Sequence, residues 1–207
     1  MTIALPSIRV RRQDAIKRSL DVFVSVVALV ALAPLFLAIA LIVRFDSPGP
    51  IFYRKERPGR NLEPFGMLKF RTMTVGSDTL KPEDFQALGY GPQEKSKSDP
   101  RVTRSGRLLR RFSLDELPQF INVLRGEMSV VGPRPLLGWE MDREDLLARS
   151  SVLPGISGLW QVSGRSNLSF REMLTLDLDY VERRSLALDV LIILKTIPAM
   201  LSRRGAY

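Results

Sequence analysis

The sequence predicts a mixed α/β protein that is rich in helix, has short strands, and begins with a helix inserted in a membrane. Residues 22–43 form an apolar run without a charged side chain, interrupted only by Ser25 and Pro34. After this run, short β-rich stretches are followed by longer stretches with the periodicity of amphipathic helices. The chain has 207 residues, enough for one domain of ordinary size and a smaller unit. We therefore expect a basic N-terminus and membrane helix over residues 1–45 and a compact domain over residues 46–207.

The apolar run is long enough to cross a bilayer, because its residues extend about 33 Å as a helix. A signal peptide has a shorter apolar region of about 7–15 residues. Basic residues flank the run equally, so the positive-inside rule gives no preferred orientation. Pro34 removes a backbone hydrogen bond near the middle, so a segment that enters and leaves on one face satisfies both flanks, with a kinked spanning helix as the alternative. The flanking residues are Arg9, Arg11, Arg12, Lys17 and Arg18 before the run, and Arg44, Arg54, Lys55, Arg57 and Arg60 after it.

The elements of the domain follow in order. Ser47-Pro48-Gly49-Pro50 is a rigid exit from the membrane, and Pro58-Gly59-Arg60-Asn61 is a turn between two strands. Residues 76–100 are polar and contain Gly and Pro, which predicts a long surface excursion. The strands are expected at 51–53 and 65–70, and helices at 105–112, 114–125, 139–149, 169–184 and 186–201.

Two segments near the C-terminus need separate comment. Residues 154–165 are predicted to be a short strand between two Gly-rich bends. The last helix, 186–201, is strongly apolar but contains Asp189, Lys195 and Pro198. We therefore expect it to lie on the domain or on the membrane surface, not to form a second span.

The composition restricts the chemistry. The chain has no His and no Cys, which excludes Ser-His-Asp triads, thiol nucleophiles, disulfides and Cys-ligated metals. Catalysis must then use carboxylates, Lys or Arg, hydroxyls, or a metal bound by oxygen. The formal net charge is +9, which indicates a polyanionic partner: nucleic acid, anionic lipid or nucleotide phosphate.

An acidic pair, Asp115-Glu116, lies in the segment Ser113–Gln119. Ser113 and Glu116 have the spacing of a capping box at a helix N-terminus, which explains the pattern without an active site. The functional interpretation uses the same geometry, because a helix N-terminus lowers the pKa of Asp115 and attracts phosphate. Both interpretations remain open. Neighbouring helical side chains diverge by about 100°, so Asp115 and Glu116 need not share one role.

Basic residues precede this pair. Arg104, Arg107 and Arg111 share one face if the segment is helical, and this face either is solvated or recognises phosphate. The cluster lacks the interleaved aromatic residues on which bases stack, which argues against nucleic acid. Its members are Lys95, Lys97, Arg101, Arg104, Arg107, Arg110 and Arg111, against the acidic Asp99.

Arg134 lies between Pro133 and Pro135, so a stiff loop presents its guanidinium at low entropic cost, or the loop is a plain turn. Asp177 falls within the apolar stripe of the helix predicted at 169–184, whereas Asp179 falls on the opposite face. A carboxylate on a buried face is costly unless it is paired or binds a metal. Asp177 is therefore a site candidate or one half of a structural ion pair, for example with an Arg.

Together these segments resemble the bacterial sugar transferases, the small monotopic phosphoglycosyl transferases. The resemblance runs in the same order over nearly the whole chain. It rests on Lys17-Arg18 with Asp21, DSPGP at 46–50, KFRTM at 69–73, SLDELPQ at 113–119, VVGPRPL at 130–136, GLWQVSGR at 158–165, and LDLDYV and LDVLIILKT near the end.

The resemblance implies a re-entrant membrane helix broken at Pro34, flanked by Lys17, Arg18 and Asp21, and a catalytic domain on the cytoplasmic face of the bacterial inner membrane. It implies transfer of a sugar-1-phosphate from a UDP-sugar to undecaprenyl phosphate with Mg²⁺, which starts assembly of a glycan. In that mechanism Asp115 attacks the sugar-bearing phosphate, releases UMP and becomes covalently linked to the phosphosugar. Glu116 is then the expected Mg²⁺ ligand. The expected phosphate- and substrate-binding residues are Lys69, Arg71, Arg110, Arg134 and Asp177.

One position departs from the resemblance: many members have Ser-Pro at the helix break, whereas this chain has Ala33-Pro34. The GLWQVSGR segment resembles that of the hexose-1-phosphate transferases, which favours glucose or galactose over N-acetyl sugars as the transferred sugar. Two other functions remain open: a non-enzymatic basic module that binds anionic membranes or nucleic acid, and direct transfer with Asp115 as a general base. The sequence leaves the oligomeric state open, a homo-oligomer included.

Overall fold

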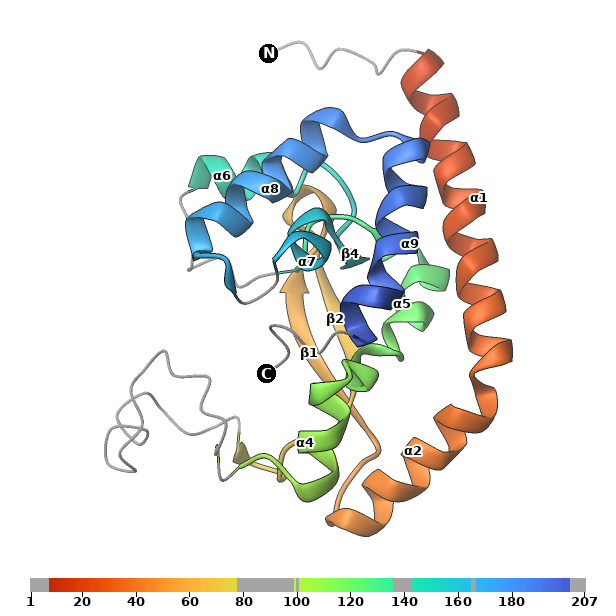
Figure 1. Cartoon of the computed structure of the whole chain (residues 1–207), viewed down its shortest axis with the longest axis vertical. Helices are drawn as coiled ribbons and strands as arrows, with labels where there is room; N and C mark the ends of the chain where they lie inside the picture. The colour runs from red at the N-terminus through yellow and green to blue at the C-terminus, as the bar shows by residue number, and fades with distance from the viewer. Residues whose placement is uncertain (1–7, 78–98, 100, 136–142, 165–166, 202–207) are drawn as a thin grey trace.

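The computed structural model describes residues 8–77, 99, 101–135, 143–164 and 167–201, with side chains from residue 14 onward. The predicted excursion at 76–100, the start of the helix predicted at 139–149, and Lys95 and Lys97 therefore lie largely or wholly outside the described residues. Two long helices run along one side of the molecule, and the rest of the domain lies on their inner side (Figure 1). The fold class is confirmed as mixed α/β, rich in helix, with short strands.

The apolar segment forms two helices, α1 (Ile8–Ala31) and α2 (Ala33–Asp46), which are bent by 64° with respect to each other. Pro34 lies in the first turn of α2, where no N–H is needed, so the break falls at Leu32 just before it. Within the described residues, no single helix has the length and apolarity of a membrane span. α1 from Asp14 onward and α2 meet that criterion together.

The predicted strands form an antiparallel hairpin of β1 (Phe52–Pro58) and β2 (Pro64–Phe70), with Phe52 opposite Phe70. A 3-10 turn, η1 (Arg60–Leu62), joins them as the sequence predicts. β1 extends beyond the predicted 51–53. The sequence missed its outer part because the residues there are charged and alternate in burial but not in hydropathy. β2 turns apolar side chains to the core, and these anchor the segment that carries Lys69.

The other strands form a short parallel pair, β3 (Ser129–Val131) and β4 (Gly155–Ser157), against which α9 (Leu186–Leu201) packs. The other helices are α4 (Arg104–Arg111), α5 (Gln119–Arg125), α6 (Arg143–Arg149), α7 (Leu159–Ser163) and α8 (Phe170–Arg183). The short strand predicted within 154–165 is present as β4, but the sequence did not predict that residues 159–163 form a helix, α7. The helix predicted at 169–184 is confirmed, with Ser169 and Glu172 forming its capping box.

Two apolar clusters hold these elements together. One joins α2 to α4 and to the end of β2, and consists of Ile39, Val43, Phe70, Leu109 and Leu117. The other joins the hairpin to α5, β3, α8 and α9, and consists of Phe65, Met67, Val123, Met128, Val130, Val131, Tyr180 and Ile192. β2 contributes side chains to both clusters, and it carries Lys69 of the site described below.

Polar contacts dock the first half of α1 on the domain. Lys17 Nζ lies 2.9 Å from Asp189 Oδ2. Arg18 donates to the carbonyls of Val123 and Leu124 at 2.5 and 2.9 Å, at the C-terminal end of α5, where a cation is favourable. Asp21, only 2% exposed, accepts hydrogen bonds from β3. These three residues, which the sequence assigns to the membrane segment, therefore contact the domain.

Candidate active site

Asp115 and Glu116 lie in a single 3-10 turn, η3 (Leu114–Glu116), between α4 and α5. Ser113 has φ 55°, in the left-handed region, and its side chain does not cap the turn. The predicted capping box is therefore wrong, and the helix predicted at 114–125 begins only at Gln119. Ser113 separates α4 from η3, and the acidic pair lies beside Lys69 of β2 and Arg134 of the loop that follows β3.

Cations from two other elements meet this pair. Glu116 Oε1 lies 2.7 Å from Lys69 Nζ, on β2, and 2.5 Å from Arg134 Nη2. The second guanidinium nitrogen, Arg134 Nη1, lies 3.1 Å from Glu116 Oε2, so the guanidinium binds both carboxylate oxygens. Lys69 Nζ also lies 3.7 Å from Asp115 Oδ2. Lys69 thus bridges the two carboxylates, and Arg134 holds only Glu116.

The two carboxylates differ in their electrostatics. Burial raises the pKa of Glu116, but the charges and hydrogen bonds of Arg134 and Lys69 outweigh burial and hold this pKa well below its usual range. For Asp115, burial dominates and raises the pKa; Lys69 opposes it, and the negative charge of Glu116 adds to it. The predicted lowering of the Asp115 pKa is therefore wrong. Asp115 is a desolvated and more basic carboxylate, and a more basic carboxylate is a stronger nucleophile.

Arg110 approaches the pair from α4. Its Nε donates to Thr72 Oγ1 at 2.9 Å. Its positive charge offsets part of the rise that burial causes in the pKa of Asp115. Arg104, Arg107 and Arg111 are exposed on the other side of α4, as the predicted shared face requires. The site therefore joins one buried nucleophile candidate, one carboxylate held by two cations, and an inward-facing guanidinium.

Comparisons with known proteins identify the family of the chain. The family model described as bacterial sugar transferase matches residues 12–203.

The chain belongs to the bacterial sugar transferase family.

It is 44% identical over 198 residues to an exopolysaccharide production protein, ExoY, of Sinorhizobium fredii, covering 92% of this chain and 88% of that protein. It is 39% identical to a UDP-glucose:undecaprenyl-phosphate glucose-1-phosphate transferase of Caulobacter vibrioides, covering 94% of this chain and 73% of that one. It is 38% identical to an undecaprenyl-phosphate galactose phosphotransferase of Salmonella typhimurium, covering 95% of this chain and 43% of that longer protein.

Asp177 of this sugar transferase is fully buried on α8 and pairs with Arg149 of α6, whose Nη2 lies 2.6 Å from Asp177 Oδ2. The carboxylate therefore has the Arg partner that the sequence offers as one alternative. Burial raises the pKa of Asp177 to about 6, although the charge of Arg149 opposes this. Contact between Asp177 and a substrate stays a prediction.

This pKa gives Asp177 a measurable effect on stability. The folded protein holds the proton up to about pH 6, whereas the unfolded chain loses it near 3.8. The stability contributed by the protonated group is therefore complete below about pH 4 and is lost as the pH rises through 6. We expect the difference in unfolding free energy between the unsubstituted protein and Asp177→Asn to decrease by about 2 kcal/mol between pH 4.5 and 7. Denaturant unfolding at both pH values measures it, and a difference independent of pH would contradict the assignment.

Arg71 is not brought to the carboxylates. Its guanidinium donates to the backbone carbonyls of Val43, Ser47 and Pro48, at 3.1, 2.6 and 2.5 Å, where α2 ends. Successive residues of an extended segment point to opposite sides, so Arg71 and Lys69 would share a side in a continued strand. β2 ends at Phe70, however, and Arg71 turns towards α2. The sequence-based assignment of Arg71 to phosphate binding has no support in this geometry.

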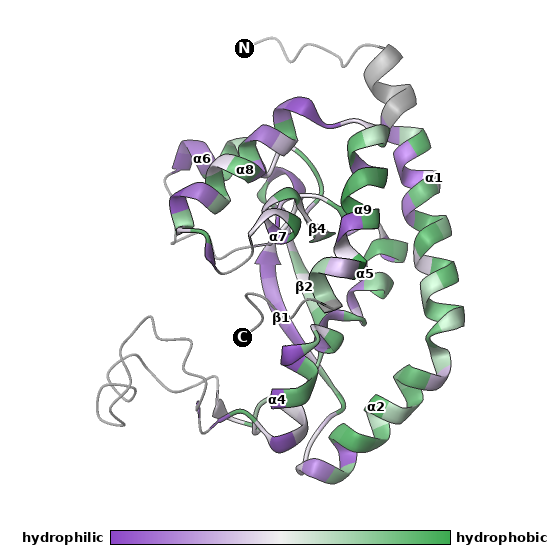
Figure 2. Cartoon of the chain, in the orientation of Figure 1, coloured by the Kyte–Doolittle hydropathy of each residue, from purple (hydrophilic) through white to green (hydrophobic). Residues whose placement is uncertain are grey.

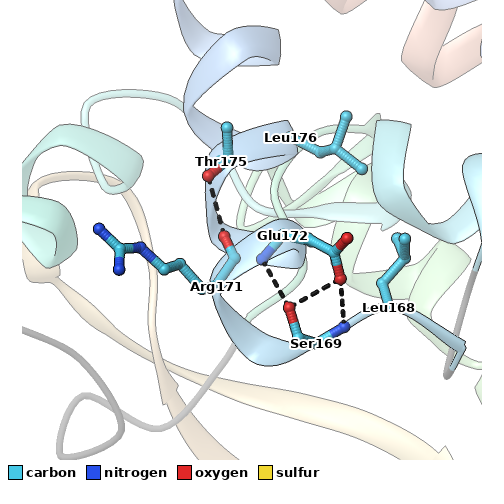
Figure 3. A pocket seen from close by; sticks show the side chains of 6 residues that line it. All are labelled: Leu168, Ser169, Arg171, Glu172, Thr175 and Leu176. Atoms are coloured by element: carbon cyan, nitrogen blue, oxygen red, sulfur yellow. Dashed lines mark hydrogen bonds between the residues drawn. The ribbon is translucent and has the colours of Figure 1, made fainter.

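A groove of about 700 Å³ lies elsewhere, along the start of α8 (Figure 3). Ser169 and Glu172 bind each other in the capping box, and the Thr175 hydroxyl donates to the Arg171 carbonyl at 2.9 Å. These polar groups thus complete the helix, and none of the candidate catalytic residues lines the groove. We assign the groove no role.

Sequence reasoning missed two members of the site. Thr72 follows β2 and positions Arg110, and Arg149 is the buried partner of Asp177. An isolated Thr or Arg has no pattern that distinguishes it from a surface residue. The only available signal for Arg149 was the demand of a buried Asp177 for a cationic partner.

Proposed function

We propose that the protein transfers a sugar-1-phosphate from a UDP-sugar to undecaprenyl phosphate through a covalent aspartyl-phosphosugar intermediate, and that it thereby starts the assembly of a bacterial glycan such as an exopolysaccharide. The names of relatives that cover nearly all of this chain support the reaction. The observation that carries the mechanism is the position of Asp115: it is buried, which raises its pKa, and it lies 3.7 Å from Lys69 and next to a carboxylate that two cations hold. The relatives' names support glucose or galactose as the sugar.

The reaction has two displacements. First, an Asp115 carboxylate oxygen forms a bond with the sugar-bearing phosphorus, the bond to the bridging oxygen breaks, and UMP leaves with the electron pair. An oxygen of undecaprenyl phosphate then attacks the same phosphorus, and the aspartyl oxygen leaves as the carboxylate. Both nucleophiles are anions, so neither step needs a general base, which fits a chain without His. Lys69, Arg110 and Arg134 stabilise the negative charge on the transferred phosphate.

The donor set fits Mg²⁺ held jointly by protein and substrate. Mg²⁺ is typically bound by one or two carboxylates together with substrate phosphates. The described residues contain no group of three or more acidic side chains that could hold a metal alone. Glu116, whose pKa is held low, is the carboxylate we assign to Mg²⁺; because Lys69 and Arg134 hold both of its oxygens, one of these cations would have to release an oxygen to the metal. When bound, Mg²⁺ supplies positive charge that neutralises the diphosphate and the departing UMP.

Intact mass spectrometry tests this proposal. The detergent-solubilised protein is incubated with UDP-glucose or UDP-galactose and Mg²⁺, without a lipid acceptor. We expect a mass increase of one hexose phosphate that is absent from Asp115→Asn. Turnover in the presence of undecaprenyl phosphate, but without any adduct on rapid quenching, would favour direct transfer. A protein that binds anionic vesicles in a salt-dependent manner and turns over neither nucleotide sugar would be the non-enzymatic basic module.

We further propose that α1 and α2 form a re-entrant segment in the bacterial inner membrane, with the domain on the cytoplasmic face. Asp14, near the start of α1, lies 3.2 Å from Arg184 and 4.0 Å from Arg60 of the hairpin turn. Chain segments before and after the apolar run therefore meet on the same side. The outer face of α1 and α2 is apolar (Figure 2), with Val30 72% and Phe45 84% exposed. α9 adds an exposed apolar face and is assigned to the membrane surface.

This topology predicts the labelling of single cysteines. The chain contains no cysteine, so one introduced at position 5 or at position 60 is its only thiol. We expect a membrane-impermeant maleimide to label neither position from the periplasm of intact cells and both in inverted vesicles. Labelling of position 5 from the periplasm, with position 60 still protected, would show a spanning helix instead.

A further inference from the structure

Arg149 connects two parts of the molecule that the reaction scheme leaves unlinked. Its side chain is 5% exposed, at the C-terminal end of α6. Nε and Nη2 lie 3.1 and 2.6 Å from Asp177 Oδ2, and Nη2 also lies 2.7 Å from the backbone carbonyl of Arg134. One guanidinium thus joins α8 to the loop that carries Arg134.

Two other features bear on how this loop fixes Arg134: the Arg134 backbone N–H faces Asp177 and helps to lower the pKa of that carboxyl, and prolines flank Arg134 on both sides. Pro133 and Pro135 have no N–H, so neither can donate a backbone hydrogen bond. Upstream, Gly132 N donates to the Ser157 carbonyl and the Pro133 carbonyl accepts from Gly155 N, both at 2.9 Å. At Arg134 itself, the carbonyl is held by Arg149. The direction of the peptide that follows Arg134 is therefore set from α6.

The energetics favour positioning over stability as the reason for this pair. Removing a carboxylate and a guanidinium from water costs several kcal/mol for each ion, and apolar replacements of buried ion pairs are often as stable. A planar guanidinium, however, can serve a carboxylate and a carbonyl together in one fixed geometry. A Lys ammonium would keep the charge but not this fork.

We infer that Arg149 is a positioning residue for the transfer reaction: anchored by Asp177, it holds the Arg134 backbone so that the Arg134 guanidinium reaches Glu116 and the transferred phosphate. The inference rests on the proposed function, because it needs Arg134 to act on a substrate. A displacement of about 1 Å at a substrate-positioning group can cost about 100-fold in rate.

The test uses Arg149→Lys, which keeps a cation for Asp177, with Arg183→Lys as the matched control. Arg183 also pairs with an aspartate of α8, Asp179, but that pair is exposed. Initial rates of UMP release are measured with UDP-glucose or UDP-galactose, Mg²⁺ and undecaprenyl phosphate, together with melting temperatures. We expect Arg149→Lys to melt close to the unsubstituted protein but to react about 10–100-fold more slowly. Arg183→Lys should be unchanged in both measurements.

A double-mutant cycle separates positioning from a general structural effect. In an Arg134→Met background, Arg149→Lys should lower the rate less than about threefold, because the residue through which it acts is gone. An equal loss in both backgrounds, or an Arg149→Lys rate equal to that of the unsubstituted protein, would overturn the inference while leaving the proposed function intact. No turnover by the unsubstituted protein with either nucleotide sugar would remove the proposed function and this inference with it.

Discussion

Asp115→Asn is expected to lower the rate of UMP release by more than about 10³-fold, since an amide cannot form the phosphoryl bond. The substitution preserves the shape of a side chain that is 7% exposed, so the fold should survive. It also removes a negative charge beside Glu116, so substrate binding should not weaken. The loss should therefore appear in kcat and not in KM, as measured by steady-state UMP release over a range of UDP-glucose or UDP-galactose concentrations.

Asp179→Asn is the matched control. It makes the same chemical change at a residue outside the site: Asp179 lies on α8, in an exposed pair with Arg183. Its rate should equal that of the unsubstituted protein. If Asp115→Asn kept a tenth or more of the activity, Asp115 would not be the nucleophile.

Arg134→Met is expected to lower the rate by about 10²–10³-fold, the usual effect of removing one preorganised donor to developing negative charge. The variant loses a guanidinium that holds both oxygens of Glu116, and Lys69 alone remains to neutralise that carboxylate. The pKa of Glu116 should then rise towards its usual range, because the largest charge that lowers it is gone. The rate of adduct formation at pH 7 measures the first effect, and an earlier fall of this rate in the variant as the pH is lowered towards 4 measures the second.

A retained charge should rescue this variant only in part. Arg134→Lys keeps a cation for Glu116 but cannot bind both carboxylate oxygens, so its rate should lie between those of Arg134→Met and the unsubstituted protein. Equal rates for Arg134→Lys and Arg134→Met would show that the fork, and not the charge, is what matters. A rate for Arg134→Met equal to the unsubstituted rate would contradict a role for Arg134 in the reaction.

Much of the fold could be predicted because its signals are local. Apolar spacing predicts the helices at 105–112, 169–184 and 186–201, and the Pro-Gly-Arg-Asn turn predicts the hairpin. Pro34 marks the helix break to within two residues. The errors fall where one local signal allows two backbones: Ser113 and Glu116 have capping-box spacing, but Ser113 adopts the left-handed region and the box does not form.

The site was predicted in its members more than in its geometry. Asp115, Glu116, Arg110 and Arg134 were named from their sequence context and Lys69 from the family resemblance, and the structure places Lys69 beside both carboxylates and Arg134 beside Glu116. The predicted direction of the pKa shift of Asp115 was wrong. A helix dipole was expected to lower this pKa, whereas burial dominates and raises it. Burial depends on what packs over a residue, and a local pattern does not contain that information.

The sequence by itself determined the chemistry that is open to this protein: no His, no Cys, an acidic pair, basic residues around it and an apolar segment broken at Pro34. The tertiary structure alone decided which charges meet. Lys69 reaches Glu116 across 47 residues, and Arg149 reaches Asp177 across 28. Arg71, two residues from Lys69, instead holds the end of α2. Charges act over a few ångströms in space, whereas periodicity and turn chemistry constrain only neighbours along the chain, so the pairing of the charges is fixed only when the elements pack.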